Sequence, residues 1–334
     1  MSTSPTNDDE RETAELLGQL KVKPSAAARE RAFAKLQQDF DAQHSPAQAR
    51  PRGRWAKGLT MAAGIAVAIV GVWLLRDSPQ EALVARVEAM TGSVGIRALG
   101  MGQEPRPLAA DGVVPSGSTL ITSDPGGVLV RVSPDLTVRL AAGTYARFMA
   151  ADEVELTQGQ LFVDATPGAH VPLKVVTQFG TVTHLGTQYL VKLGTDGVEV
   201  AVREGRAQLA SPSVTSVAEA GRWVLHRDAN ADPVAGDLQP FDPRFEWIGR
   251  LPTDFQLEGA TLAGFLAWFQ RETGLTPIYS PGLDAGKFAQ VQLKGSIENL
   301  EPLEALSYVL ATADLAWHRE GAKVVIEQSQ AGTG

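Results

Sequence analysis

The chain has 334 residues, a formal net charge of −8 at pH 7 and no cysteine. The absence of cysteine excludes disulfides, thiolate zinc sites and a cysteine nucleophile. The acidic charge balance argues against nucleic-acid binding as the main activity. The length leaves room for about two domains beyond a short N-terminal region.

The N-terminal region, residues 1–57, is predicted to contain two short helices that carry apolar stripes. The side chains of these stripes are Leu16, Leu17, Leu20, Phe33, Leu36 and Phe40. Because so short a pair of helices does not bury a core alone, the stripes predict a binding segment for a protein partner. The alternative is a partly folded, membrane-proximal helix with no partner.

Residues 58–75 form an uncharged, mainly apolar run between Lys57 and Arg76. As an α-helix this run would extend for about 27 Å, close to the thickness of a bilayer hydrocarbon core. Basic residues precede it with no acidic residue after Asp41, whereas acidic residues balance the basic ones that follow. The positive-inside rule therefore predicts one transmembrane helix with a cytoplasmic N-terminus. A buried helix of a soluble protein and a cleaved secretory signal are the alternatives, and the length of the run and its distance from the N-terminus disfavour them.

Residues 83–226 predict an all-β domain, because short runs of alternating apolar residues recur between Gly, Pro and Asp. The runs around Val130 and Val200 are examples. Strands at this spacing fit a sandwich, a barrel or a β-solenoid-like fold, and periodicity does not choose among them. Residues 227–250, which are acidic and contain Pro and Gly, predict a linker.

Residues 251–328 predict a small α+β domain with the order βαββαββ. An apolar stripe through Phe265 and Phe269, followed by Gly274, predicts the first helix, and Pro302 suits the first turn of the second. The predicted elements are strands at 255–257, 277–279 and 291–293, helices at 262–274 and from 302 to 310, and a hairpin that joins 315–319 to 323–327.

No conventional active site is evident in the sequence. The histidines are scattered without metal-ligand spacing, and there is neither a Gly-rich phosphate loop nor a Gly-x-Ser-x-Gly motif. The sequence therefore predicts a protein that is not an enzyme and has no metal, cofactor or small-molecule substrate.

The middle of the chain resembles the FecR family of membrane-anchored sigma-factor regulators, through a set of short segments in a fixed order. These segments are 91–94 (TGSV), 114–122 (VPSGSTLIT), 135–140 (DLTVRL), 156–163 (LTQGQLFV), 185–191 (LGTQYLV) and 202–205 (VREG). The C-terminal domain is similar to the secretin and TonB short N-terminal (STN) domain, a periplasmic interaction module. That similarity is carried by residues 262–274, 291–296 and 303–310.

The resemblance to FecR implies signal transduction across the bacterial inner membrane. It implies that the cytoplasmic segment acts as an anti-sigma factor or otherwise regulates transcription through an extracytoplasmic-function sigma factor. It also implies that the periplasmic domains receive a signal from a TonB-dependent outer-membrane receptor. A periplasmic scaffold that organises an envelope complex, without a sigma-factor partner, is the alternative.

Self-cleavage is a further activity that the resemblance implies for some relatives, at a Gly-Thr bond that matches Gly186-Thr187. In that N-to-O acyl shift the threonine hydroxyl attacks the preceding carbonyl, so it needs a strained turn and an activating group, for which His184 is a candidate. Alternatively, Gly186 makes a β-bulge and Thr187 is an ordinary strand residue. We favour this second interpretation.

Overall fold

The computed structural model describes residues 82–98, 104–166, 172–184, 188–227, 232–239 and 241–329. Their contacts place them in one unit, Pro79–Gly334. The predicted helices within residues 1–57 and the predicted membrane span at 58–75 lie outside the described residues. Within the part of the chain that is described, no helix is both long and apolar enough to cross a membrane.

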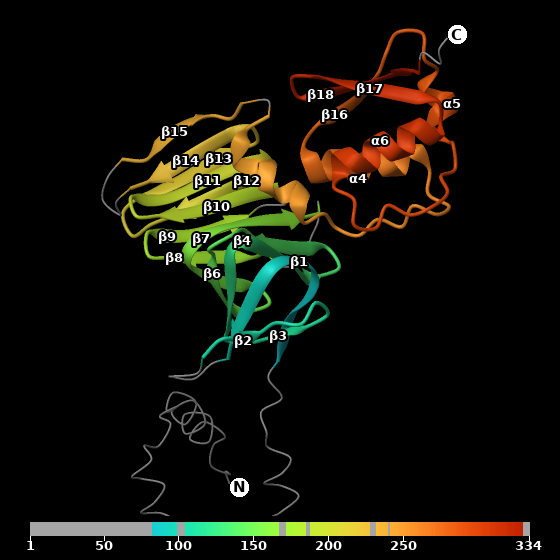
Figure 1. Cartoon of the computed structure of the whole chain (residues 1–334). Helices are drawn as coiled ribbons and strands as arrows, with labels where there is room; N and C mark the ends of the chain where they lie inside the picture. The colour runs from blue at the N-terminus through green and yellow to red at the C-terminus, as the bar shows by residue number, and fades with distance from the viewer. Residues whose placement is uncertain are drawn as a thin grey trace, which may run out of the picture. The chain divides into compact units, whose positions relative to one another are not determined.

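Most of the described chain forms a 15-stranded sheet, drawn in cyan to yellow in Figure 1. Its strands in the first half are β1 (Leu83–Arg97), β2 (Arg106–Pro107), β3 (Val113–Pro115), β4 (Ser118–Ser133), β5 (Leu136–Leu140), β6 (Tyr145–Ala150), β7 (Glu153–Ala165) and β8 (Lys174–Thr177). Those in the second half are β9 (Gly180–His184), β10 (Gln188–Gly194), β11 (Gly197–Glu204), β12 (Arg206–Ala210), β13 (Thr215–Glu219), β14 (Arg222–His226) and β15 (Val234–Asp237).

The sheet is folded into two layers because the long strands β1, β4 and β7 each contribute one half to each layer. The first layer has the order β2-β1-β4-β6-β7-β8-β9-β12-β13. The second has the order β3-β1-β4-β5-β7-β10-β11-β14-β15. The fold of this domain is therefore a sandwich made from one continuous sheet.

Glycine sits where two of the long strands pass from one layer to the other. Gly92 of β1 has a φ of 65° and lies at a break in the register with β4. Gly159 of β7 has a φ of 87°, and the pairing of β7 changes there from β6 to β10. Positive φ is accessible to glycine at little steric cost, so these residues allow the strands to turn the corner.

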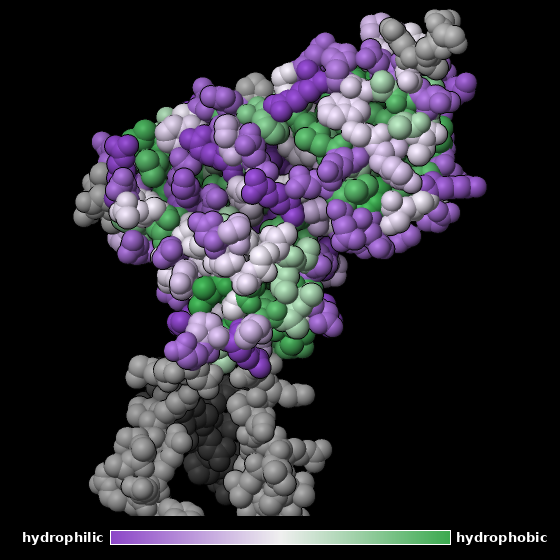
Figure 2. Space-filling model, viewed as in Figure 1, coloured by the Kyte–Doolittle hydropathy of each residue, from purple (hydrophilic) through white to green (hydrophobic). Residues whose placement is uncertain are grey.

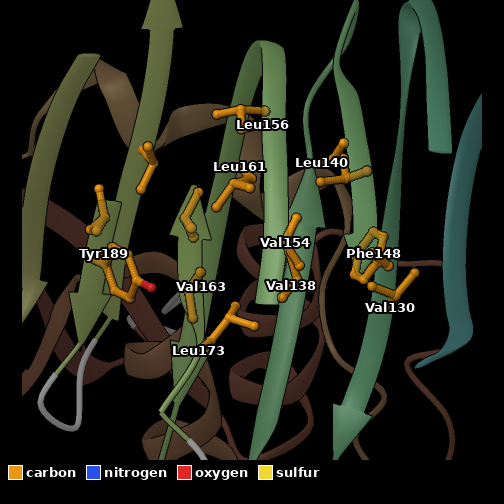
Figure 3. Packing of buried hydrophobic residues seen from close by; sticks show 14 of the residues in the cluster. Val130, Val138, Leu140, Phe148, Val154, Leu156, Leu161, Val163, Leu173 and Tyr189 are labelled. Atoms are coloured by element: carbon orange, nitrogen blue, oxygen red, sulfur yellow. The ribbon is translucent and has the colours of Figure 1, made fainter. Parts of the chain in front are cut away.

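The space between the layers is filled by one cluster of buried apolar side chains. Figure 3 shows residues of the first layer, such as Phe148 and Val154, together with residues of the second, such as Val130 and Val138. Alternate residues along each strand point into this cluster, as the sequence periodicity predicts for a strand with one buried face.

The prediction of a β-rich domain is confirmed, and the structure selects the sandwich over the β-solenoid. A β-solenoid stacks parallel strands, whereas the described strands of this sheet pair antiparallel except for β7 with β8.

The structure differs from the predicted linker at 227–250, because this stretch contains β15 and the 3₁₀ helix η1 (Pro243–Arg250). Since β15 pairs with β14, and η1 covers the sheet, the described part of this sequence contributes a strand and a helix to the fold and is not a spacer.

The C-terminal α+β domain, residues 251–328, has its own apolar core. Its elements are α4 (Leu262–Thr273), β16 (Thr276–Tyr279), α5 (Ala285–Ala289), α6 (Pro302–Thr312), β17 (Leu315–Glu320) and β18 (Lys323–Gln328). The three strands form a sheet with the order β16-β18-β17, in which β16 is parallel to β18. The two predicted long helices and the closing hairpin are confirmed.

Two predicted strands of this domain are wrong. Residues 255–257 form no strand, and at 291–293 there is only an isolated bridge between Thr261 and Gln292. Leu257 and Leu293 are buried in the domain core, so the apolar pattern reflects single side chains that reach the core and not a paired ladder. The short helix α5 was not predicted, and the order of elements is αβααββ.

We predict that Gly159→Ala destabilises the sandwich by more than Gly143→Ala. Both residues have positive φ, so each substitution costs about 1 kcal/mol in backbone conformation. A Cβ at Gly159 would also lie 2.5 Å from the Thr144 Oγ1 atom and 2.7 Å from its Cα, whereas a Cβ at Gly143 meets nothing within 4 Å. Urea denaturation of the two variants measures the difference, and equal losses of unfolding free energy would contradict this account of the corner.

Candidate functional site

The outer face of the second layer carries a row of side chains that is mostly apolar. Cross-strand register places in this row Arg139, Phe162, Leu190, Ala201 and Trp223, from β5, β7, β10, β11 and β14 in turn. Phe162, Leu190 and Ala201 are buried although they point away from the core between the layers. Another element must therefore cover this face.

The covering element is η1. Phe245 and Ile248 pack on the apolar row, and the rings of Phe245 and Phe162 meet edge to face at a centroid distance of 6.2 Å. Asp242 caps η1 by accepting a hydrogen bond from the Arg244 N–H at 3.1 Å. Burial raises the pKa of Asp242, but hydrogen bonds from the Arg244 backbone and side chain outweigh burial and lower it below its usual value.

A buried ion pair lies beside this apolar contact. Arg139 of β5 and Glu272 of α4 both have side chains that are 1% exposed, and Arg139 Nη2 is 2.6 Å from Glu272 Oε2. Arg139 Nε also donates to the Leu251 carbonyl at 2.7 Å, and the Thr253 hydroxyl donates to the other oxygen of Glu272. Asp164 Oδ2 lies 4.0 Å from Arg139 Nη1. The two buried charges are thus paired and further hydrogen-bonded, as burial of charge requires.

The end of α4 makes further contacts with the sandwich. The Arg271 side chain pairs with Asp164. Gln188 Nε2 donates to the Arg271 carbonyl at 3.0 Å, and Arg203 Nη1 lies 3.4 Å and 3.3 Å from the carbonyls of Arg271 and Glu272. The last carbonyls of a helix have no partner within it and carry partial negative charge, so cationic and amide donors stabilise them.

Arg203 is held between aromatic rings. Its guanidinium carbon is 5.4 Å from the Phe162 ring centroid and 4.6 Å from that of Phe245, within the range of a cation–π interaction. Burial, and then the positive charge of Arg139, lower the pKa of Arg203 to about 10, although nearby carboxylates oppose this shift. Arg203 remains a cation at neutral pH.

These contacts define the charged junction, the candidate site of this protein. Its members are Arg139, Asp164, Gln188 and Arg203 of the sandwich, and Arg271 and Glu272 of α4. The junction has no nucleophile next to a base. Across the described ranges, no group of His, Asp and Glu side chains could hold a metal ion. The arrangement can bind the C-terminal domain to the sandwich through ion pairs and hydrogen bonds.

A groove of about 560 Å³ adjoins the junction. Its lining includes Leu251, Thr253 and Trp268, and the Trp268 indole N–H donates to the Thr253 carbonyl at 3.1 Å. The surface in Figure 2 is largely hydrophilic, with separate hydrophobic patches. One wall of the groove is the chain around Thr253, whose hydroxyl donates a hydrogen bond to Glu272 of the junction.

The predicted site residues lie outside the described residues, apart from the backbone of His184. The apolar stripes of residues 1–57 lie outside the described residues, as do Gly186 and Thr187. His184 is the last residue of β9 by its backbone. The prediction of self-cleavage stays a prediction.

The residues of the charged junction were not predicted from the sequence. A signal for them exists: Arg139, Asp164 and Arg203 each interrupt an apolar strand, in LTVRL, LFVDA and VAVRE. A charge at an outward position of a strand is usually exposed, but the apolar Phe162 and Ala201 also point outward from two of these strands. Apolar residues on both faces indicate that the outer face is covered and that its charges have partners there. The identity of the partner does not follow from the strand itself.

Comparison with known proteins identifies the domain that bears most of the junction. The family model described as FecR protein matches residues 118–208, which run from β4 into β12. These residues are a FecR domain, as the resemblance predicted. No curated protein sequence matches the chain.

Two crystal structures of a protein from Parabacteroides distasonis, proposed there to be an anti-sigma factor, are similar to the chain. They share 16% and 15% sequence identity with it, each with a TM-score of 0.33, and cover 63% of this chain and 98% of their own. Sequence identities and TM-scores this low carry no information about the function of this protein.

We predict that Arg139→Met and Glu272→Gln each destabilise the protein by about 3–5 kcal/mol, because each leaves a buried charge or donor without its partner. Their effects should not add: the double variant loses less than the sum, since neither buried charge is then left alone. Arg222→Met is the control, because the Arg222–Asp237 pair is exposed, at 51% and 79%, and such pairs contribute about 0–1 kcal/mol. Denaturant titrations give all four values, and additive losses would show that the pair does not interact.

Proposed function

We propose that the chain is an anti-sigma-factor-like signalling regulator, anchored in the inner membrane by a single pass. In this proposal it relays a protein contact made in the periplasm to an extracytoplasmic-function sigma factor. The observation that carries the proposal is the FecR domain at residues 118–208, which follows the apolar run at 58–75 in the sequence.

The cytoplasmic part in this proposal is residues 1–57, oriented by the basic residues that precede the apolar run. The partner surface consists of the apolar stripes already named. An amphipathic helix that has no core of its own gains most by burying its apolar face on another protein.

The periplasmic part consists of the sandwich and the C-terminal domain, which resembles an STN domain. A TonB-dependent outer-membrane receptor is the proposed source of the signal. Two large apolar side chains of α6, Leu303 and Tyr308, are 39% and 45% exposed, which supports this helix as a docking face for a protein.

We predict that the full-length chain purifies with an extracytoplasmic-function sigma factor, and that Leu36→Asp reduces the recovered sigma factor at least about ten-fold. A carboxylate in the apolar stripe would be buried without a partner at the interface. Lys35→Gln is the matched control, because it changes the adjacent residue outside the stripe. Mass spectrometry identifies the sigma factor and quantifies it.

Transcription distinguishes this proposal from an envelope scaffold. Deletion of residues 1–57 changes transcription of the sigma factor's target genes if the chain is a regulator. Recovery of no sigma factor, together with unchanged transcription after the deletion, would exclude the proposal and favour a scaffold without a sigma-factor partner.

We further propose that the protein is not an enzyme and does not cleave itself at Gly186-Thr187. Full-length protein and Thr187→Ala should then give identical bands by immunoblot with antibodies to both ends of the chain. A pair of shorter products in the wild type, absent from Thr187→Ala, would show that the hydroxyl of Thr187 attacks the Gly186 carbonyl.

A further inference from the structure

The contact between the sandwich and the C-terminal side of the chain has two parts of different chemistry. Under η1 it is apolar and consists of Phe245 and Ile248 on the row of the second layer. At the end of α4 it is the charged junction. Arg244 of η1 adds an ion pair with Glu199 of β11, at 2.8 Å, so η1 is fixed to the sheet by both packing and charge.

The apolar cores do not extend across the charged junction. Among the described residues, the cluster between the layers contains only sandwich residues, and the cluster of the C-terminal domain contains residues from Phe241 onward. Separation at the charged junction would therefore expose charged and amide groups. It would also remove Phe241, which precedes η1, from the edge of the C-terminal cluster and from the guanidinium of Arg319, while the rest of both cores would stay closed. Water hydrates the exposed charged and amide groups, which offsets much of the Coulomb energy that is lost.

The chain between the two parts of the contact suits a hinge. Residues 252–256 form neither helix nor strand, and Phe255 among them packs against Phe265 and Trp268 of α4. The hinge therefore lies at the start of this segment, at 251–252. Hydrogen bonds of Thr253 with Glu272 and Trp268 hold this segment to α4. Since both partners belong to α4, the chain from Thr253 onward moves with the C-terminal domain when α4 leaves the sandwich.

The end of α4 is shaped to receive Arg203. Gly274 ends the helix with a φ of 74°, and a Cβ at this position would lie 2.9 Å from Arg203 Nε. The glycine thus terminates α4 and leaves room for the guanidinium to reach the carbonyls of Arg271 and Glu272.

We propose that the charged junction is a releasable clamp. The C-terminal domain alternates between a docked state, with the end of α4 held by Arg139, Asp164, Gln188 and Arg203, and a less populated released state in which it turns about residues 251–252. In both states η1 stays on the sandwich. This inference concerns only residues of the described structure and does not depend on a sigma factor.

Distance measurement on the full-length chain tests the clamp. The chain has no cysteine, so Val217→Cys and Tyr308→Cys place two spin labels at unique, exposed sites, 53% and 45% exposed, on the sandwich and the C-terminal domain. The wild-type background should give one narrow distance distribution by double electron–electron resonance. Glu272→Gln should add a second, broader population, while Arg222→Met should not.

Each result has a defined meaning. In Glu272→Gln, hydrogen exchange should accelerate at least about ten-fold more at the end of α4 than in η1, α6 and β18, because opening of the junction adds to the general loss of stability. A single unchanged distance in Glu272→Gln would overturn the clamp. So would an equal acceleration of exchange throughout the sandwich and the C-terminal domain, because the network would then be needed for folding and not for docking alone.

Discussion

The pairing of Arg139 with Glu272 is the constraint on which the arrangement of the described chain depends. A guanidinium with 1% exposure is tolerated only where an opposite charge and hydrogen-bond acceptors surround it. This requirement fixes the last turn of α4 above β5. It also fixes the Leu251 carbonyl, because Arg139 Nε donates to it. A strand charge, a helix end and the chain that joins the domains are therefore positioned by one interaction.

The FecR domain combines this polar contact with a fold built on apolar layers. Because β1, β4 and β7 each serve both layers, a contact on the outer face of one of them is made with a strand that belongs to both halves of the sandwich. Asp164 belongs to β7 and lies in the charged junction, so docking of the C-terminal domain contacts a strand that spans both layers. If the clamp and the proposed signalling role both hold, a partner of the C-terminal domain would act on the FecR domain through this strand.

Much of the fold was predictable because its signals are local. Alternating valines around Val130 and Val200 predicted strands, and the positions of Gly274 and Pro302 predicted where α4 ends and α6 begins. The strands predicted at 255–257 and 291–293 failed, because a strand exists only if a partner pairs with it, and partners are set by distant parts of the chain. For the same reason, the sequence did not show that residues 227–250 include a strand of the sheet and a helix that covers it.

The sequence by itself determined which side chains face the core between the layers, since a period of two assigns each residue to one face of a strand. It also indicated a FecR domain through short segments in order, and an apolar run at 58–75. Only the tertiary structure decided which element covers the outer face of the second layer and that Arg139 meets Glu272, 133 residues away. Residues so distant in sequence become neighbours through the folding of the sheet and the docking of α4, and no local pattern records which two will meet.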